Sequence, residues 1–137
     1  MQLDKVQPKN KRQLKQLINY AFKHNIYDLN FIDTSEITDM SLLFSNCMHN
    51  FDVSSWDVSN VTCMEYMFVN CKNFNCDLSY WDVSNVTDMY SMFTMCKNFK
   101  GKGLENWDVS KAEDIRYMFS GCDKMTIPNW YKLYHKK

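Results

Sequence analysis

Hydrophobic and polar positions recur along the chain with a period of about 25 residues. Two apolar columns mark this period, one mostly tryptophan (Ile32, Trp56, Trp81 and Trp107) and one always phenylalanine (Phe44, Phe68, Phe93 and Phe119). Four segments of equal length end at the phenylalanines, namely residues 28–44, 52–68, 77–93 and 103–119. Such a period is typical of stacked repeats, in which each unit buries its apolar face against its neighbours.

Two different spacings follow one another within each unit. From Leu78 to Val83 the pattern is L-x-x-W-x-V, close to the strand of a leucine-rich repeat, which predicts a short strand. From Val86 to Phe93 the apolar residues are spaced by three, three and one, which predicts about two helical turns. The sequence therefore predicts an α/β fold: a leucine-rich-repeat-like solenoid of four units of about 25 residues, each a strand, a turn and a short helix.

The segments before and after the repeats are predicted to cap them within one domain, residues 1–137. Residues 1–27 are a lead and a capping helix, since an apolar stripe begins after Lys11 (Leu14, Leu17, Ile18, Ala21 and Phe22). The repeats fill residues 28–123. In residues 124–137, Pro128 ends the repeat pattern, and aromatic and apolar residues can lie across the last unit as a second cap (Trp130, Tyr131, Leu133 and Tyr134).

The formal net charge of zero hides an uneven distribution. Residues 1–27 carry six basic and one acidic side chain, residues 28–123 six basic and fifteen acidic, and residues 124–137 four basic and none acidic. An acidic body argues against nucleic-acid binding, which favours a continuous basic face. No stretch approaches the roughly 18 apolar residues of a membrane span, so no membrane contact is predicted, and we expect a monomer.

Candidate catalytic and metal-binding residues do not form a recognisable constellation. His24, His49 and His135 are scattered, no C-x-x-C pair is present, and three glycines cannot build a phosphate loop. One cysteine column follows each column Phe by three residues and is predicted to hold reduced packing thiols (Cys47, Cys71, Cys96 and Cys122). Cys63 and Cys76 lie outside it and are the candidates for reactivity. We expect no enzyme activity, no metal and no cofactor.

An aspartate follows the tryptophan column in every unit: Asp33, Asp57, Asp82 and Asp108. Stacked carboxylates repel one another unless something compensates. They can accept hydrogen bonds from nearby backbone N–H groups or serines in turns, form an acidic stripe for a basic partner, or bind a cation. Partner specificity is expected where units differ and point outward, and Phe31 and Tyr80 are the candidate contact residues, since aromatic side chains are enriched at binding centres.

The motif W-D-V-S-N-V-T-D-M-x-x-M-F-x-x-C, nearly intact at residues 56–71 and 81–96, resembles a bacterial surface-protein repeat, the DUF285 or BspA-like family. The resemblance implies a relation to leucine-rich repeats, and many members are lipoproteins or wall-anchored proteins proposed to act in adhesion. We expect a non-catalytic protein-interaction module that uses its strand face, with a surface or secreted adhesin as the alternative. Without a signal peptide or lipobox, the predicted location is the cytoplasm, or the surface by a signal-less route.

Overall fold

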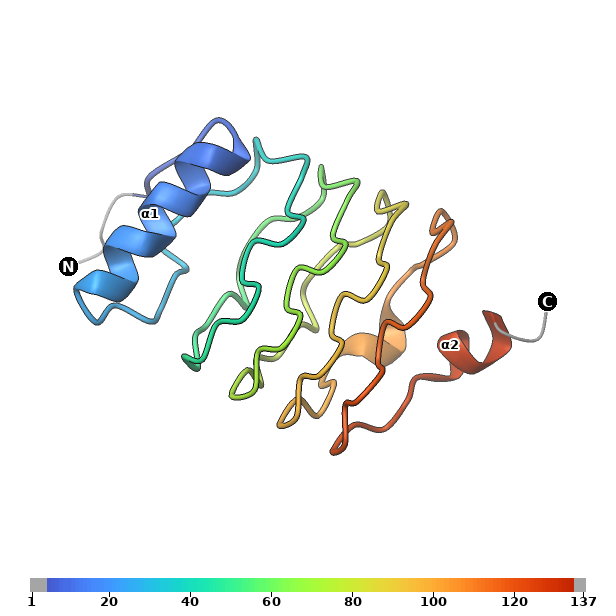
Figure 1. The fold of residues 1–137 in the computed structure, drawn as a ribbon. Helices are drawn as coiled ribbons and strands as arrows, with labels where there is room; N and C mark the ends of the chain where they lie inside the picture. The colour runs from blue at the N-terminus through green and yellow to red at the C-terminus, as the bar shows by residue number, and fades with distance from the viewer. Residues whose placement is uncertain (1–4, 135–137) are drawn as a thin grey trace.

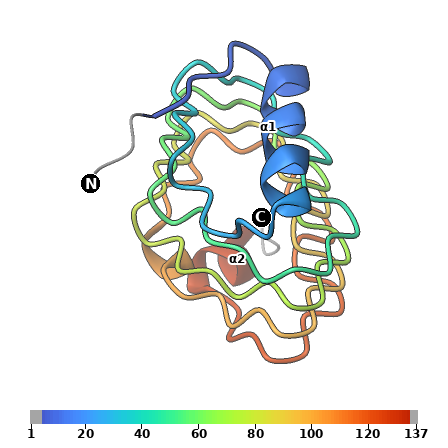
Figure 2. The same ribbon diagram turned by 90° about the vertical axis from the view of Figure 1, so that its left-hand side faces the viewer.

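The structure is a computed structural model that describes residues 5–134. Its helices are α1 (Lys11–Lys23), the 3-10 helix η1 (Leu104–Asn106) and α2 (Asn129–Tyr134). Between α1 and α2 the chain runs in successive coils that lie side by side (Figure 1). Viewed along the stack, the coils overlie one another and α1 lies across the near end (Figure 2). Helices α1 and α2 therefore lie at the two ends of the stack, and the coils between them form its body.

Helix α1 forms where the sequence predicts the capping helix. The Asn10 side chain accepts a hydrogen bond from the Gln13 N–H at 2.9 Å, which satisfies one free donor of the first turn. Leu14, Ile18 and Ala21 are fully buried against the first repeat. Asn25, with a φ of 59°, follows the last turn and ends the helix in the left-handed conformation that asparagine tolerates. Helix α1 therefore lies within the predicted segment, residues 1–27, and across one end of the stack (Figure 2).

The predicted short helix of each repeat is instead a run of tight turns, which we call the turn run: residues 40–47, 64–71, 89–96 and 115–122. In the first turn run every second N–H donates to a carbonyl of the next repeat, from Met40, Leu42, Phe44 and Asn46. The intervening N–H groups donate three residues back, as from Leu43 to Met40. Leu42 and Asn46 have φ values of 60° and 61°, which a right-handed helix excludes.

In the segment predicted to be a strand, aspartate side chains form turns, so the backbone is not extended throughout. Asp52 and Asp57 each accept a backbone N–H from the serine two residues later, at 2.9 Å and 3.0 Å, forming Asx turns. Between them the Trp56 N–H donates to the Val53 carbonyl. Within residues 5–134, β pairing is confined to isolated parallel bridges such as that between Asp28 and Asp52. The predicted α/β class, with strand, turn and helix units like a leucine-rich repeat, is therefore wrong.

The tryptophan and phenylalanine columns do line up through one interior. The rings of Phe44, Phe68, Phe93 and Phe119 stack in sequence with centroids 5.7 Å, 5.4 Å and 5.8 Å apart. Each indole N–H donates to a carbonyl one repeat earlier, as from Trp81 to Val53 at 2.9 Å. Thiols of the cysteine column do the same, as from Cys96 to Phe68 at 3.0 Å. Side-chain donors thus join each repeat to the one before it.

Candidate functional site

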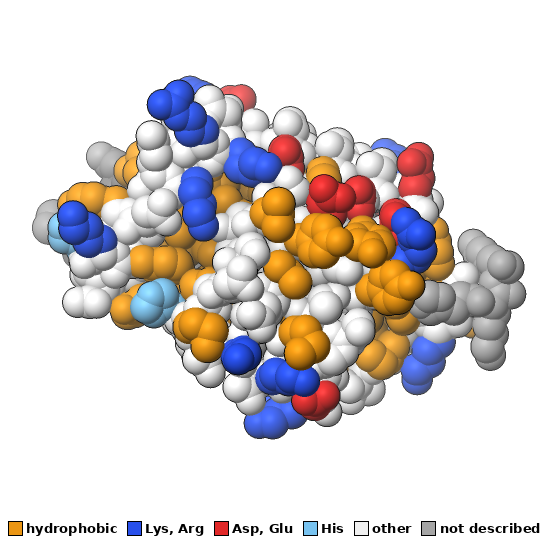
Figure 3. Space-filling view, viewed as in Figure 1, with side chains coloured by type: hydrophobic (Ala, Val, Ile, Leu, Met, Phe, Trp, Pro, Cys, Tyr) orange, Lys and Arg blue, Asp and Glu red, His pale blue; other side chains and the backbone are white. Residues whose placement is uncertain are grey.

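Each turn run directs apolar side chains inward and leaves the residues between them at the surface. Tyr66, Tyr90 and Tyr117 lie on this outer side in successive repeats, and we call this surface the tyrosine face. Tyr66 and Tyr90 meet edge to face with ring centroids 5.3 Å apart, and Tyr90 and Tyr117 do so at 5.7 Å. Hydrophobic side chains, tyrosine included, gather beside acidic side chains on the visible face of the molecule (Figure 3). Tyr117 is exposed, and Tyr66 and Tyr90 are half-buried. Partly exposed aromatic rings with polar hydroxyls are common at binding sites.

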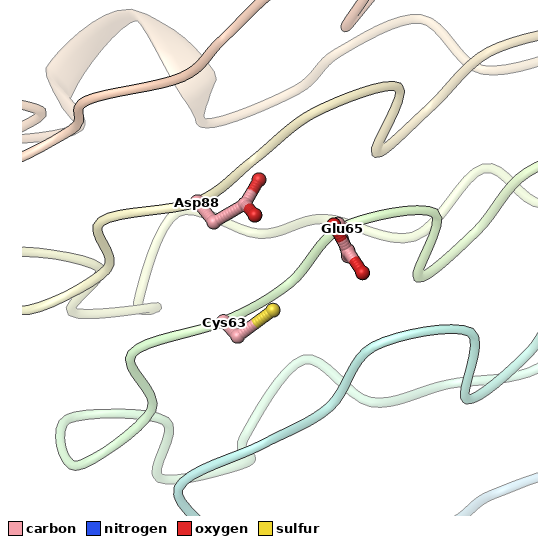
Figure 4. Close-up of side chains that lie close together, drawn as sticks. All are labelled: Cys63, Glu65 and Asp88. Atoms are coloured by element: carbon pink, nitrogen blue, oxygen red, sulfur yellow. The ribbon is translucent and has the colours of Figure 1, made fainter.

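An acidic cluster lies beside the tyrosine face. The ligand atoms of Cys63, Glu65 and Asp88 all lie within 4.8 Å of one another, and all three side chains are partly buried. Figure 4 shows them over two neighbouring coils, with Cys63 and Asp88 reaching toward Glu65. Burial, and then the neighbouring Asp88, raises the pKa of Glu65. Two ionised carboxylates at this distance repel one another, and either a bound cation or a proton shared between Glu65 and Asp88 relieves the repulsion.

The same turn position is neutralised by a cation at both ends of the stack. Asp39 in the first repeat pairs with Lys11 at 3.2 Å, and Asp114 in the last pairs with Arg116 at 2.9 Å. The Arg116 guanidinium also lies 5.2 Å from the centroid of the Tyr90 ring. The two carboxylates in the middle of this surface, Glu65 and Asp88, have no salt-bridge partner among the described residues.

Cys63 occupies the column where the other repeats have aspartate. Burial raises the pKa of the Cys63 thiol, and the Glu65 backbone N–H opposes that shift. Its sulfur and the two carboxylates could supply three ligands to a divalent cation such as zinc. Structural zinc sites use four protein ligands, and the part of the chain that the structure describes brings only these three together.

The structure places the predicted contact residues apart from this cluster. Tyr80 is 86% exposed, whereas Phe31 is half-buried and packs against the core. The aspartate column forms Asx turns, with each carboxylate accepting the N–H of the serine two residues on (Asp33, Asp57, Asp82 and Asp108). Hydrogen bonds from Ser84 lower the pKa of Asp82. The expected hydrogen bonds to serine are present, so these carboxylates shape the turns.

Cys76, the second candidate for reactivity, and His49 both pack against other residues of the chain. Cys76 is buried, which raises its thiol pKa to about 12, so it is protonated near neutral pH. It borders a recess of about 400 Å³ that also contains Asp28, Asp52 and Asp77. The His49 ring packs against two aromatic rings, with its centroid 4.9 Å from that of Phe22 and 4.9 Å from that of Tyr27. His135 lies outside the described residues.

Sequence reasoning missed two features of the repeat. Phe51, Phe74 and Phe99 lie between the four segments of equal length, yet all three are buried and their rings contact one another beside the main phenylalanine column. The tyrosine face was missed because its residues were assigned to helix. A signal existed, since the position before each column cysteine is Asn46, Asn70, Met95 and Gly121, and asparagine and glycine there predict a left-handed turn.

Stacked turns, columns of interior aromatics and side chains that bond from repeat to repeat define a repeat protein whose surface varies over a constant core. The chain belongs to the family described as Mycoplasma protein of unknown function, DUF285, which it matches over residues 12–130. Comparison with curated proteins and with solved structures found no match. The described residues contain no helix long and apolar enough to cross a membrane.

Proposed function

We propose that this protein is a non-catalytic protein-interaction module that binds a basic segment of a partner protein on the tyrosine face. The observation that carries the proposal is the acidic pair Glu65 and Asp88, which lies beside Tyr66 and Tyr90 without a cation of its own. An arginine or lysine of a partner would supply the missing charge. Charge-assisted hydrogen bonds and cation–π contacts would then act together.

The chain itself contains an example of this chemistry. Arg116 donates to both carboxylate oxygens of Asp114, at 3.1 Å and 2.9 Å, while its guanidinium lies over the Tyr90 ring. The face of one tyrosine is therefore accessible to a guanidinium held by a neighbouring carboxylate. A partner arginine at Glu65 and Asp88 would repeat this arrangement one unit earlier, which supports a basic partner over an acidic one.

The test measures the binding of a set of fluorescent peptides that alternate arginine with glycine or serine, with glutamate in place of arginine as the charge control. We expect the arginine peptides to bind, and the double variant Glu65→Gln with Asp88→Asn to weaken binding by about tenfold or more. Asparagine at position 88 can still accept the Tyr90 N–H, so the turn is kept. Tyr66→Ala with Tyr90→Ala should weaken binding by a similar factor.

Tyr80→Ala is the matched control, because Tyr80 is more exposed than any tyrosine of the proposed surface but lies outside it. Its binding should equal that of the wild type. Equal binding by the double carboxylate variant and the wild type would contradict binding at the tyrosine face. If instead Tyr80→Ala or Phe31→Ala alone abolishes binding, the binding site includes the contact residues predicted from the sequence and not the tyrosine face.

A further inference from the structure

The last repeat ends in a row of backbone donors that we call the donor edge. In the third repeat the N–H groups of Met89, Ser91, Phe93 and Met95 donate to carbonyls of the fourth repeat. The equivalent N–H groups in the fourth repeat have no hydrogen-bond partner within residues 5–134 (Ile115, Tyr117, Phe119 and Gly121). Their intervening neighbours keep the usual bonds three residues back, so the turn run itself is intact. The edge is therefore formed and ready to pair, like the edge of a sheet.

Two aromatic residues of the tail occupy positions that a further repeat would fill, and the Tyr134 hydroxyl donates to the Glu113 carbonyl at 2.9 Å. The Trp130 indole N–H donates to the Leu104 carbonyl at 2.7 Å, the bond that Trp107 makes to Leu78 one repeat earlier. The Tyr131 ring contacts Phe119 with a centroid distance of 5.0 Å, on the aromatic column that Phe119 ends. Helix α2 thus imitates the tryptophan and phenylalanine of a further unit but offers no carbonyl to the donor edge.

The tail is held more lightly than α1. No residue of α2 is fully buried, whereas Leu14, Ile18 and Ala21 of α1 are. A groove of about 450 Å³ separates the turn run from the tail and is lined by Tyr117, Phe119, Ile127 and Tyr131, among others. Replacement of α2 at this end therefore uncovers less buried surface than replacement of α1 would at the other.

We propose that the donor edge docks a further repeat unit of the same motif, supplied by a partner chain, and that this unit displaces α2. The surface continues an interface that the molecule already uses between its own repeats, so the occupant is defined by what covers the equivalent edge inside the stack. There, the carbonyls of Asp88, Tyr90, Met92 and Thr94 receive the N–H groups of the second repeat. An incoming unit would also bring the tryptophan and phenylalanine that α2 imitates.

A second copy of this chain is disfavoured as the occupant. Its own acceptor edge is covered by α1, where Lys15 donates to the Leu43 carbonyl at 2.7 Å and Lys11 donates to the Ser41 carbonyl at 3.3 Å. Docking of a second copy would require removal of a helix with three fully buried residues. The partner is therefore a chain whose acceptor edge is not covered by such a helix.

The test uses the full chain and a synthetic peptide of its own third unit, residues 78–96, under reducing conditions. Backbone amide exchange is followed residue by residue by NMR, with a scrambled peptide as the control. We expect saturating peptide to slow exchange at Ile115, Tyr117, Phe119 and Gly121 by about tenfold or more. The full chain with Tyr131→Ala should bind the peptide about threefold more tightly or better, because the competing tail is weakened.

Circular dichroism of Tyr131→Ala establishes that its fold is kept, and Leu133→Ala in the same helix is the matched variant that leaves peptide affinity unchanged. Lack of protection at the donor edge relative to the scrambled peptide would overturn the proposal, and so would unchanged or weaker binding by Tyr131→Ala. Protection of the same amides by self-association without peptide would identify a second copy as the occupant and contradict the assignment. The readout is the row of backbone N–H groups in the last turn run, and the Glu65 and Asp88 carboxylates of the folded chain take no part in it, so failure here leaves the proposed function standing.

Discussion

At the N-terminal end of the stack, lysine ammonium groups donate hydrogen bonds to free carbonyls of the first repeat, whereas at the C-terminal end the free N–H groups of the last repeat lie beside a groove. Lys11 and Lys15 reach the Ser41 and Leu43 carbonyls from α1, while α2 offers no acceptor to the equivalent donors. The cause is the direction of the backbone hydrogen bonds between turn runs, in which the N–H groups of one repeat donate to carbonyls of the next repeat. Stacked turns therefore have unlike ends, and a cap that suits one end cannot serve the other.

The largest expected effect is a difference in the free energy of unfolding between a variant in α1 and a variant in α2. Ile18→Ala should lower the free energy of unfolding by about 2–5 kcal/mol, because the side chain is fully buried and its removal leaves a cavity. Leu133→Ala in α2 should change it by less than about 0.5 kcal/mol, since Leu133 is 61% exposed. Urea denaturation of both variants measures the difference. Equal losses would contradict the unequal anchoring of the two ends.

The indole hydrogen bonds of Trp81, inside the stack, and Trp130, in the tail, allow a similar comparison. Trp81→Phe should cost about 1–3 kcal/mol of unfolding free energy, because it removes the bond to the Val53 carbonyl and leaves space in the core. Trp130→Phe should cost less than about 1 kcal/mol, because the ring is only partly buried. Thermal unfolding of each variant provides the values, and a larger cost at Trp130 would show that the tail is a firm cap.

The lysine bonds at the acceptor edge are expected to have a moderate effect. Lys15→Met keeps the apolar stem but removes the donor to the Leu43 carbonyl, which should lower the free energy of unfolding by about 0.5–1.5 kcal/mol. Lys23→Met is the control on the same helix, with an exposed side chain and an expected change within about 0.5 kcal/mol. If both substitutions behave alike in denaturant, the lysines do not stabilise this edge.

A smaller increase in stability is expected at the position before each column cysteine, where the backbone is left-handed. Met95 has a φ of 66° where the first two repeats have asparagine and the last has Gly121. Met95→Asn should raise the free energy of unfolding by about 0.5–1 kcal/mol, because asparagine adopts this conformation at lower cost. Met95→Ala retains the unfavourable backbone and should not stabilise. A stabilised Met95→Ala variant in the same melting experiment would assign the gain to side-chain loss.

The smallest effect concerns charge in the Asx turns. Hydrogen bonds from Ser84 hold the pKa of Asp82 below its ordinary value, so the carboxylate contributes stability above its unfolded pKa and loses it as pH falls through the lower folded pKa. Asp82→Asn should therefore be slightly less stable than the wild type at pH 6, by less than about 1 kcal/mol given its exposure. The difference should shrink as pH falls through the folded pKa of Asp82. A difference that stays constant with pH would exclude the charge as its source.

The repeat spacing predicted which residues share the interior but not the path of the backbone between them. The columns through Trp81 and Phe93, and the helix from Lys11, follow from apolar periodicity, because burial decides them. The spacing of Val86, Met89, Met92 and Phe93 suits a helix, but it suits a turn run equally well, since both return the chain inward every three or four residues. Only the left-handed residues distinguish the two, and leucine and tyrosine at those positions give no such signal.

The candidate site was less predictable than the fold because it depends on relations between repeats. Tyr66 and Tyr90 occupy different positions in their units, and only the stacking of coils brings their rings together. Glu65 and Asp88 likewise come from neighbouring repeats. The absence of an internal cation between them, within the described residues, is visible only because Lys11 and Arg116 are seen to pair elsewhere.

Amide hydrogen exchange of the free chain tests the unlike ends most directly. The N–H groups of Met89, Ser91, Phe93 and Met95 should exchange slowly, and those of Ile115, Tyr117, Phe119 and Gly121, one repeat later, should exchange faster by about a hundredfold or more. Ser120 and Cys122, which keep their bonds within the last repeat, show whether the last turn run is itself folded. Equal protection of the two rows would contradict the account.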